Sequence, residues 1–506
     1  MGGPADSFLD SIIRLTANGT IDPTFSFADY AFDNGNTSGF APTLDLTPDG
    51  QILLIDNPEV NVNPVTYTQV TGLVRVHNDY VAAASFPAST RTVNVPAGGI
   101  NPTFGAQGDV IINDPTTVWS QSSPQRAVRA TTVQADGKVL IAGSVGTVST
   151  FGIGQMFVGR LNADGTTDTT FGTNGFVHTS IGAFSVANSI AVQSDGKIVI
   201  GGVTEDSAAA PTDVRFALAR YTAAGVLDAG FGTGGIVTTD FTGNEQIDAI
   251  AIESGGEIVA AGPYFQNPNV GFHVVRYTPS GSLDTTFNTT GTLTVNLGAP
   301  ASGAFAFPTA LAMQPDGRIL IGSRSGGNAA IYRYNTNGVI DGGFGSGGIA
   351  FNPSTATGGS ISAMAVLPGG KIVAAAAGLE PTSSPTSVNL MRFSSAGIAD
   401  STFGNGGAEF LSSSGLGLEA DPLDPTFPKY PTVYLLVPQS DGGTIAVGTR
   451  AALEDNVPVG ILPLVTRVAS DGTVDSTFAD SVDPRFTPPT YFRGQVARAA
   501  AVAPDG

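Results

Sequence analysis

Cysteine is absent from this sequence, and histidine is nearly so, with three residues among 506. Without cysteine there are no disulfides and no thiolate metal sites, and the redox compartment is not readable from the sequence. The histidines, His77, His178 and His273, form no HxH or HExxH motif, so a histidine-based metal site is not expected. No apolar run approaches the roughly 18 residues of a transmembrane helix, so no transmembrane segment is expected.

Positive charge is also scarce. The chain has 22 Lys plus Arg against 42 Asp plus Glu, which gives a formal net charge of −20. Nucleic acids and anionic membranes both require a basic surface, so neither is an expected partner. The opening residues MGGPADSFLD lack a basic segment followed by an apolar one, so no signal peptide is visible.

Glycine, by contrast, is abundant, and much of it lies in a repeated unit. One part of the unit reads SIAVQSDGKIVIGG at 189–202, and the next reads FALARYTAAGVLDAGFGTGG at 216–235. The phenylalanine near the end of the second part recurs at positions 25, 104, 171, 231, 287, 344, 403 and 478. The central spacings of 56 to 60 residues define a repeat of about 60 residues.

Each repeat predicts four short antiparallel strands. SIAVQ and KIVIGG flank a DG turn typical of a β-hairpin, FALARY predicts a third strand, and GIVTT at 235–239 predicts a fourth. Apolar residues occur at both odd and even positions of the predicted strands, as expected when both faces of a sheet pack on neighbouring sheets. We therefore expect an all-β fold in which residues 1–506 form a single β-propeller of seven or eight four-stranded blades.

The first and last repeats are incomplete, and two explanations remain open. The chain begins at a third strand, SFLDSIIRL, and ends within a first hairpin, AAAVAPDG. Either the two ends share one blade and close the ring, or the chain is a piece of a longer repeat protein. Longer spacings indicate insertions near 78–98, 105–129 and 408–433.

The turn between the third and fourth strands has two interpretations. In the copy at 162–175, NADGTTDTTFGTNG, the side chains of Asn162, Asp164 and Asp168 are spaced as in a calcium loop. Other copies place Ala224 or Ala396 where Asp164 stands, and these supply no side-chain oxygen. The glycine nearly always stays, as a turn with positive φ requires. A structural turn is favoured, and 162–168 is the best single candidate for calcium.

An arginine lies eight residues before the last aspartate of the turn in seven copies. The pairs are Arg14–Asp22, Arg160–Asp168, Arg220–Asp228, Arg276–Asp284, Arg333–Asp341, Arg392–Asp400 and Arg467–Asp475. Each arginine shares a strand face with an aliphatic residue two positions earlier, so it points toward buried surface and requires a partner. We expect a structural Arg–Asp pair in each blade, with a two-point geometry that lysine does not match. An anion-binding ring of arginines is disfavoured, because the aspartates would cancel its charge.

Two insertions contain further candidate ligand-binding residues. In 408–433 an acidic and aromatic set is suited to contacting a cation or a sugar, and a cap over the ring is the alternative: Glu419, Asp421, Asp424, Phe427 and Tyr430. In 105–129 the single tryptophan, Trp119, is suited to stacking on a ligand or to filling a gap between blades.

SDGKIVIGG followed by FALARYTAAGVLDAGFGTGG resembles the delta-60 repeat family of bacterial proteins. The resemblance covers nearly the whole chain and departs from the family pattern at the insertions and in the C-terminal stretch. It implies a β-propeller-like fold in a secreted or cell-surface protein, and it carries over no catalytic residue.

The expected function is therefore non-catalytic: adhesion, assembly or contact with a protein or glycan at a blade rim, alone or as a segment of a larger or filamentous protein. Self-assembly belongs to this expectation. No cofactor is expected apart from the calcium candidate. The alternative is a hydrolase or lyase with a site at the central channel, since a Ser-His-Asp site can assemble from distant residues, although no GxSxG motif supports it. A purely structural spacer is the third interpretation.

Overall fold

The structure is a computed structural model that describes strand backbone between residues 43 and 112 and most of the chain from 124 to 475. The longer segments outside the described residues are 1–42, 96–108, 113–123, 148–153, 206–213, 299–309, 352–359, 378–386, 413–431 and 476–506. Shorter ones are 47–51, 57–58, 64–65, 70, 77–80, 87–88, 242, 267–268, 326–327, 440 and 455–456.

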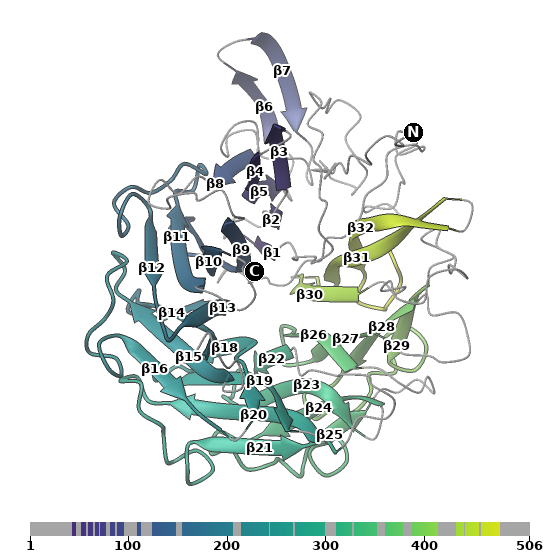
Figure 1. Ribbon diagram of the computed structural model, residues 1–506. Coiled ribbons are helices and arrows are strands. Elements are labelled where there is room, and N and C mark those ends of the chain that lie inside the picture. The colour runs from purple at the N-terminus through teal and green to yellow at the C-terminus, as the bar shows by residue number, and fades with distance from the viewer. Residues whose placement is uncertain are drawn as a thin grey trace, which may run out of the picture.

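Regular structure in the described part of the chain is entirely β and comprises seven antiparallel sheets of three to five strands and two separate two-stranded hairpins (Figure 1). The first sheet contains β1 (Thr43–Leu46), β2 (Ile52–Asp56), β5 (Thr71–Val76) and β8 (Asp109–Ile112). The second contains β9 (Pro124–Val133), β10 (Val139–Thr147), β11 (Gly154–Leu161) and β12 (Phe176–Thr179). The third contains β13 (Phe184–Val192), β14 (Ile198–Glu205), β15 (Val214–Tyr221) and β16 (Ile236–Thr239).

The fourth sheet has five strands: β17 (Asn244–Glu245), β18 (Ala249–Ile252), β19 (Ile258–Gln266), β20 (Asn269–Tyr277) and β21 (Thr292–Asn296). The fifth contains β22 (Ala310–Met313), β23 (Ile319–Ser325), β24 (Asn328–Tyr334) and β25 (Ile349–Phe351). The sixth contains β26 (Ser360–Val366), β27 (Ile372–Ala377), β28 (Ser387–Phe393) and β29 (Ala408–Ser412). The seventh contains β30 (Thr432–Pro438), β31 (Thr444–Glu454) and β32 (Val457–Val468).

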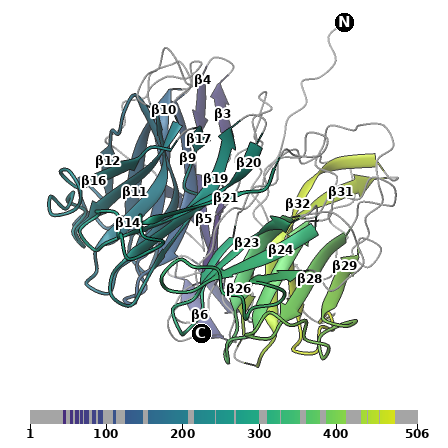
Figure 2. The ribbon, with the colours of Figure 1, turned by 90° about the horizontal axis from the view of Figure 1, so that it is seen from below.

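The seven sheets are arranged radially. Their first strands contact one another in sequence, in the order β1, β9, β13, β18, β22, β26, β30. The later strands lie farther out, with β12, β16, β21, β25 and β29 at the periphery (Figure 1). From below, the second to fourth sheets lie on one side and the fifth to seventh on the other (Figure 2). The predicted all-β propeller architecture is confirmed, and the blade number of the whole chain stays a prediction.

The DG turn forms the predicted hairpin between the first two strands of a sheet. In the third sheet Val192 pairs with Ile198, and the five residues between them make the turn. Gly196 adopts φ 81°, and the carboxylate of Asp195 accepts a hydrogen bond from the backbone N–H of Lys197 at 3.1 Å. The aspartate and the glycine of the DG pair thus have separate conformational roles.

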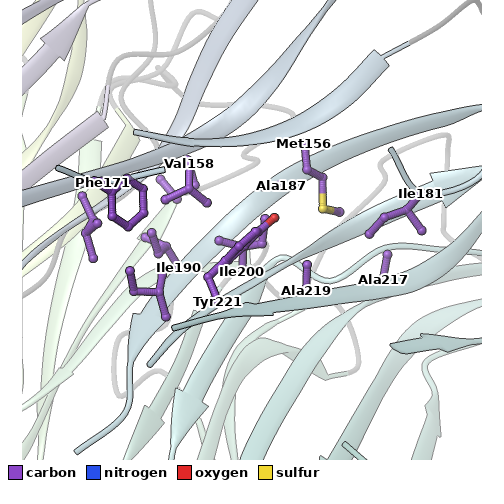
Figure 3. Packing of buried hydrophobic residues seen from close by; sticks show 14 residues of the cluster. Met156, Val158, Phe171, Ile181, Ala187, Ile190, Ile200, Ala217, Ala219 and Tyr221 are labelled. Atoms are coloured by element: carbon purple, nitrogen blue, oxygen red, sulfur yellow. The ribbon is translucent and has the colours of Figure 1, made fainter. Parts of the chain in front are cut away.

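The core lies between sheets rather than within one. Tyr221 and Ile200 of the third sheet pack in one cluster with Val158 and Phe171 of the second (Figure 3). The opposite face of the third sheet, including Leu218, packs in a second cluster with residues of the fourth sheet. Because both faces are covered, seven of the eight residues of β14 are buried. Each fully buried large aliphatic or aromatic side chain stabilises the fold by about 1.5–3 kcal/mol.

The predicted insertions include several strands. Segment 78–98 contains the hairpin of β6 (Val81–Phe86) and β7 (Ser89–Val95), and a second separate hairpin is formed by β3 (Glu59–Asn63) and β4 (Thr66–Gln69). Segment 105–129 contains β8 and the start of β9, and segment 408–433 begins with β29 and ends in β30. The strands β8, β9, β29 and β30 belong to the radial sheets, whereas the two hairpins do not.

Candidate functional site

One end of the blades carries both kinds of repeated turn. Because the strands alternate in direction, the DG hairpin and the turn that follows the third strand emerge at the same end. In the second sheet, for example, Val139 pairs with both Val133 and Leu161 beside these turns. We call this end the turn face, defined by residues 162–168, 222–228, 278–284, 335–341, 394–400 and 469–475.

The predicted arginines and aspartates are brought together on the turn face. The Nε atom of Arg160 donates to Asp168 at 2.7 Å, and the equivalent bonds are 2.9 Å in Arg220–Asp228, 2.8 Å in Arg276–Asp284, 2.9 Å in Arg333–Asp341 and 2.8 Å in Arg392–Asp400. These five arginine side chains are buried, whereas that of Arg467 is 34% exposed and lies 3.4 Å from Asp475. Arg14 and Asp22 lie outside the described residues.

Each paired aspartate uses both of its oxygens. In Asp168, Oδ2 accepts from Arg160, while Oδ1 accepts from the backbone N–H of Thr170 at 3.1 Å and from its hydroxyl. Burial raises the pKa of Asp168, but hydrogen bonds from Lys138 and Thr170 and the charge of Arg160 outweigh it and lower the pKa well below its ordinary value. The aspartate is therefore ionised and holds both the strand end and the following turn.

The same arginines also bind the next sheet. The Nη1 atom of Arg160 donates to the carbonyl of Ala223 in the third sheet. Four further arginines make the equivalent bond, to the carbonyls of Pro279, Thr336, Ser395 and Ser470. The backbone N–H of Gly172 donates to the neighbouring carbonyl, that of Ala224, at 2.9 Å. Two consecutive carbonyls of each following turn are thus held by the preceding sheet, an arrangement we call the inter-sheet clamp.

The repeated phenylalanine and glycine complete this clamp. The guanidinium of Arg220 lies 4.5 Å from the ring centroid of Phe231, and equivalent distances in the other clamped sheets are 4.4 to 5.1 Å. Gly225 has φ 81°, and a Cβ atom there would lie 2.9 Å from the ring of Phe171 in the preceding sheet. The glycine is thus required by its backbone conformation and by close packing.

The basic residue of the DG hairpin is a second partner of the aspartate. The ammonium group of Lys138 lies 2.8 Å from Asp168, and that of Lys371 lies 2.7 Å from Asp400. This pairing was not predicted from the sequence. In the fourth sheet a glutamate, Glu257, replaces it, and Glu253 lies 3.6 Å from Arg276.

The calcium candidate at 162–168 has its side chains engaged within the turn. Asp164 accepts from the backbone N–H of Thr166 at 2.9 Å, and the amide of Asn162 donates to the Thr166 hydroxyl at 3.0 Å. Asp168 points instead to Arg160. Within the part of the chain that the structure describes, no group of three or more His, Cys, Asp or Glu residues is placed to hold a metal ion.

Two histidines lie within the described residues, His178 on β12 and His273 on β20. His273 is buried, stacks on Phe241 with ring centroids 4.0 Å apart, and shares a 2.9 Å hydrogen bond between Nδ1 and the Thr294 hydroxyl. Burial lowers the pKa of His273 to about 4. At neutral pH this neutral ring packs among aromatic neighbours, which include Tyr264 at 4.7 Å.

Exposed aliphatic side chains recur on the turn face in five consecutive sheets. We call them the aliphatic row: Val226, Leu283, Val339, Ile340, Ile398 and Val474. Each stands one or two positions after the glycine of its turn. The stretches 222–227, 278–283, 335–340 and 394–399 contain no charged residue, whereas the flanking turns contain Asp164 and Asp471. The row was not predicted from the sequence, although its signal is a Val, Leu or Ile one or two positions after the turn glycine.

The other predicted ligand-binding residues, Trp119, Glu419, Asp421, Asp424, Phe427 and Tyr430, lie outside the described residues. In the described part, no helix has the length and apolarity needed to cross a membrane.

Comparison with known proteins gives a match at the level of the repeat. A family described as "Domain of unknown function (DUF5122) beta-propeller" matches residues 9–25, 134–171, 193–231, 254–287 and 314–344. Four of these five segments run from the hairpin of the first two strands, which has a DG turn in three of them, to the phenylalanine that packs on the arginine. The chain is a β-propeller repeat protein. No curated protein matches it.

Solved structures with a similar fold are distant in sequence. They include a virginiamycin B lyase from Staphylococcus aureus, at 12% identity over 70% of this chain and 94% of that one, with a TM-score of 0.31. An α-L-arabinofuranosidase from Fusarium graminearum has 12% identity over 75% and 95%, with a TM-score of 0.38. The polysaccharide lyase Uly1 has 10% identity over 90% and 98%, with a TM-score of 0.41.

The expectation that this propeller is not an enzyme is corrected by these matches. Each of the three similar structures is that of an enzyme, so a propeller of this kind does not by itself indicate a non-catalytic protein. At 10–12% identity they assign no reaction to this chain.

Proposed function

We propose that this propeller is a protein-contact module of a secreted or cell-surface protein and that it acts in adhesion or assembly through its turn face. The aliphatic row is the observation that carries the proposal. Single exposed apolar residues are ordinary on protein surfaces, but these recur one or two positions after the turn glycine in five successive sheets. Their recurrence on one face is typical of an interaction surface.

The backbone that presents the row is ordered by the inter-sheet clamps. The turn at 222–228 carries Val226, and its carbonyls at Ala223 and Ala224 accept bonds from Arg160 and Gly172 of the preceding sheet. A surface that is held before binding loses less conformational entropy when a partner docks. The clamps therefore favour a contact role for the side chains above them.

The chemistry of the row favours a protein over a glycan. Its side chains are aliphatic, and the stretches 222–227, 278–283, 335–340 and 394–399 contain no charged residue. Apolar residues with few charges are typical of the centre of a protein interface. A glycan presents hydroxyl groups that Val226, Val339 and Ile398 do not match, because these side chains have no hydrogen-bonding atoms.

The proposal is tested by displaying the full chain on a laboratory bacterium and measuring attachment of these cells to displaying and to plain cells. We expect wild-type cells to adhere and the triple variant Val226→Ser, Val339→Ser, Ile398→Ser to lose at least about tenfold in adhesion, because tenfold corresponds to only about 1.4 kcal/mol. Phe351→Ser is the matched control, since Phe351 is 41% exposed but lies on β25 instead of a turn.

Adhesion that is absent in the wild type, or unchanged in the triple variant, would contradict the proposal. A parallel incubation of the purified chain with arabinan and with uronate-containing polysaccharides tests the enzymatic alternative. Release of sugar products would assign hydrolase or lyase chemistry to the propeller in place of a contact role.

A further inference from the structure

We infer that the partner of the aliphatic row is a second copy of this chain, docked turn face to turn face. The inference rests on the proposed function and specifies its partner. It follows from the spacing of the row, from its lack of charge, and from the charges that border it.

The row is periodic because the blades are. Val226, Val339 and Ile398 each stand directly after the glycine of their turn, and the clamps fix each turn to the preceding sheet in the same way. In the fourth sheet Ser282 has that position and Leu283 follows it, so the row recurs once per sheet without exact spacing, and gaps remain between its side chains. Another surface fills those gaps along the whole row when it has the same period, and the row of a second copy has that period.

A two-fold axis makes such a contact self-complementary. In an isologous interface both copies use the same surface patch, so that if residue i of one copy contacts residue j of the other, residue j of the first also contacts residue i of the second. The side chains of one row then enter the gaps of the other row, and the assembly is a dimer with no further growth.

The charge of the chain restricts where two copies can meet. Each copy has a net charge of −20, so copies repel over roughly the Debye length of about 8 Å at physiological ionic strength. The stretches 222–227, 278–283, 335–340 and 394–399 have no charged residue, and the aspartate after each of them is paired with an arginine, whereas the flanking turns place Asp164 and Asp471 on the same face. The row from Val226 to Ile398 is therefore the part of this face where two copies meet without the flanking carboxylates in contact.

Two of the hairpins beside the row carry both signs of charge, whereas the hairpin of the fourth sheet carries only Glu253 and Glu257. The third sheet presents Asp195 with Lys197, and the fifth presents Asp316 with Arg318. In a two-fold arrangement an acidic side chain of one copy can lie opposite a basic side chain of the other. These charged hairpins fix the relative orientation of the two copies more than they increase the affinity of dimerisation.

The test is the mass of the purified full chain in solution, measured by sedimentation velocity over a range of protein and salt concentrations. We expect a monomer–dimer equilibrium that shifts toward dimer as salt screens the negative charge. The triple variant Val226→Ser, Val339→Ser, Ile398→Ser should weaken dimerisation at least tenfold, and Phe351→Ser should dimerise as the wild type does. Circular dichroism and thermal melting verify that both variants are folded.

A wild-type chain that stays monomeric at every concentration and salt level would overturn the inference, as would a triple variant that dimerises equally well. The two proposals fail separately. A monomeric chain whose displaying cells adhere to plain cells retains the contact role and loses the second copy as partner. A chain that dimerises through the row but mediates no adhesion retains the dimer and loses the adhesive role.

Discussion

In each inter-sheet clamp, one arginine side chain contacts three different groups. The guanidinium of Arg276 lies 2.8 Å from Asp284, 5.1 Å from the ring centroid of Phe287, and in hydrogen-bonding contact with the carbonyl of Thr336 in the next sheet. Lysine has one donor group and no planar fork, so it does not satisfy all three contacts. The residue type is thus required by geometry as well as by charge.

Arg276→Ala should strongly destabilise the protein, whereas Arg467→Ala should not. Arg276 is 8% exposed and Asp284 is 13% exposed, so removal of the arginine leaves a largely buried carboxylate without its cationic partner and should cost about 3–5 kcal/mol. Arg467 is 34% exposed and lies 3.4 Å from Asp475, so its removal should cost under about 1 kcal/mol. Thermal melting of both variants beside the wild type measures the difference. Equal melting of Arg276→Ala and the wild type would show that the pair contributes nothing.

Glu253 is a residue whose replacement should stabilise the fold at neutral pH. Burial raises its pKa, Arg276 opposes the rise, and the carboxylates of Glu257 and Asp284 add to it. The equivalent residue is Gln193 in the third sheet and Gln314 in the fifth, and both accept from the local arginine, at 3.4 Å and 3.1 Å. Glutamine therefore retains the hydrogen bond without the buried charge.

The predicted effect depends on pH. A carboxyl group with a raised pKa in the folded state costs stability above that pKa, and the cost disappears as the pH falls below its ordinary value of 4.5. Glu253→Gln should melt higher than the wild type at pH 7, and the difference should shrink at pH 4. A lower melting temperature at pH 7 would mean that the ion pair with Arg276 outweighs the cost of burial.

At the scale of elements, the sequence was sufficient to predict the hairpins and the Arg–Asp pairs. The DG turn lies between two apolar strands, so a local rule places Val192 opposite Ile198. Arg220 and Asp228 are eight residues apart on either side of one turn, so their pairing requires no knowledge of the rest of the chain. Local contacts of this kind can be derived from spacing and burial alone.

The inter-sheet contacts could not be predicted in the same way. Arg160 and the carbonyl of Ala223 are 63 residues apart, and their contact depends on how two sheets stack. The turn glycine illustrates the same limit. The positive φ of Gly225 was a sufficient reason for a glycine in the turn. The second reason, the close approach of the Phe171 ring in the preceding sheet, was visible only in the structure. The pairing of Lys138 with Asp168 was missed because a lysine beside an exposed turn is usually solvated.

At the scale of the whole molecule, each sheet is stable only beside its neighbours. The third sheet buries one face against the second and the other against the fourth, and the clamps add polar contacts at one end of these junctions. Stability of such an array is a sum of the repeats and of the interfaces between them. Loosening one clamp should therefore affect two sheets.

Hydrogen exchange followed by mass spectrometry on Arg276→Ala tests this coupling most directly. In the intact clamp, Arg276 holds the carbonyl of Thr336, and the N–H of Asn288 donates to Asn337 at 2.7 Å. We predict faster exchange in 278–288 and also in the turn at 335–341 of the next sheet, with Arg276→Lys restoring only part of the protection. Faster exchange confined to the sheet that contains residue 276 would contradict the clamp.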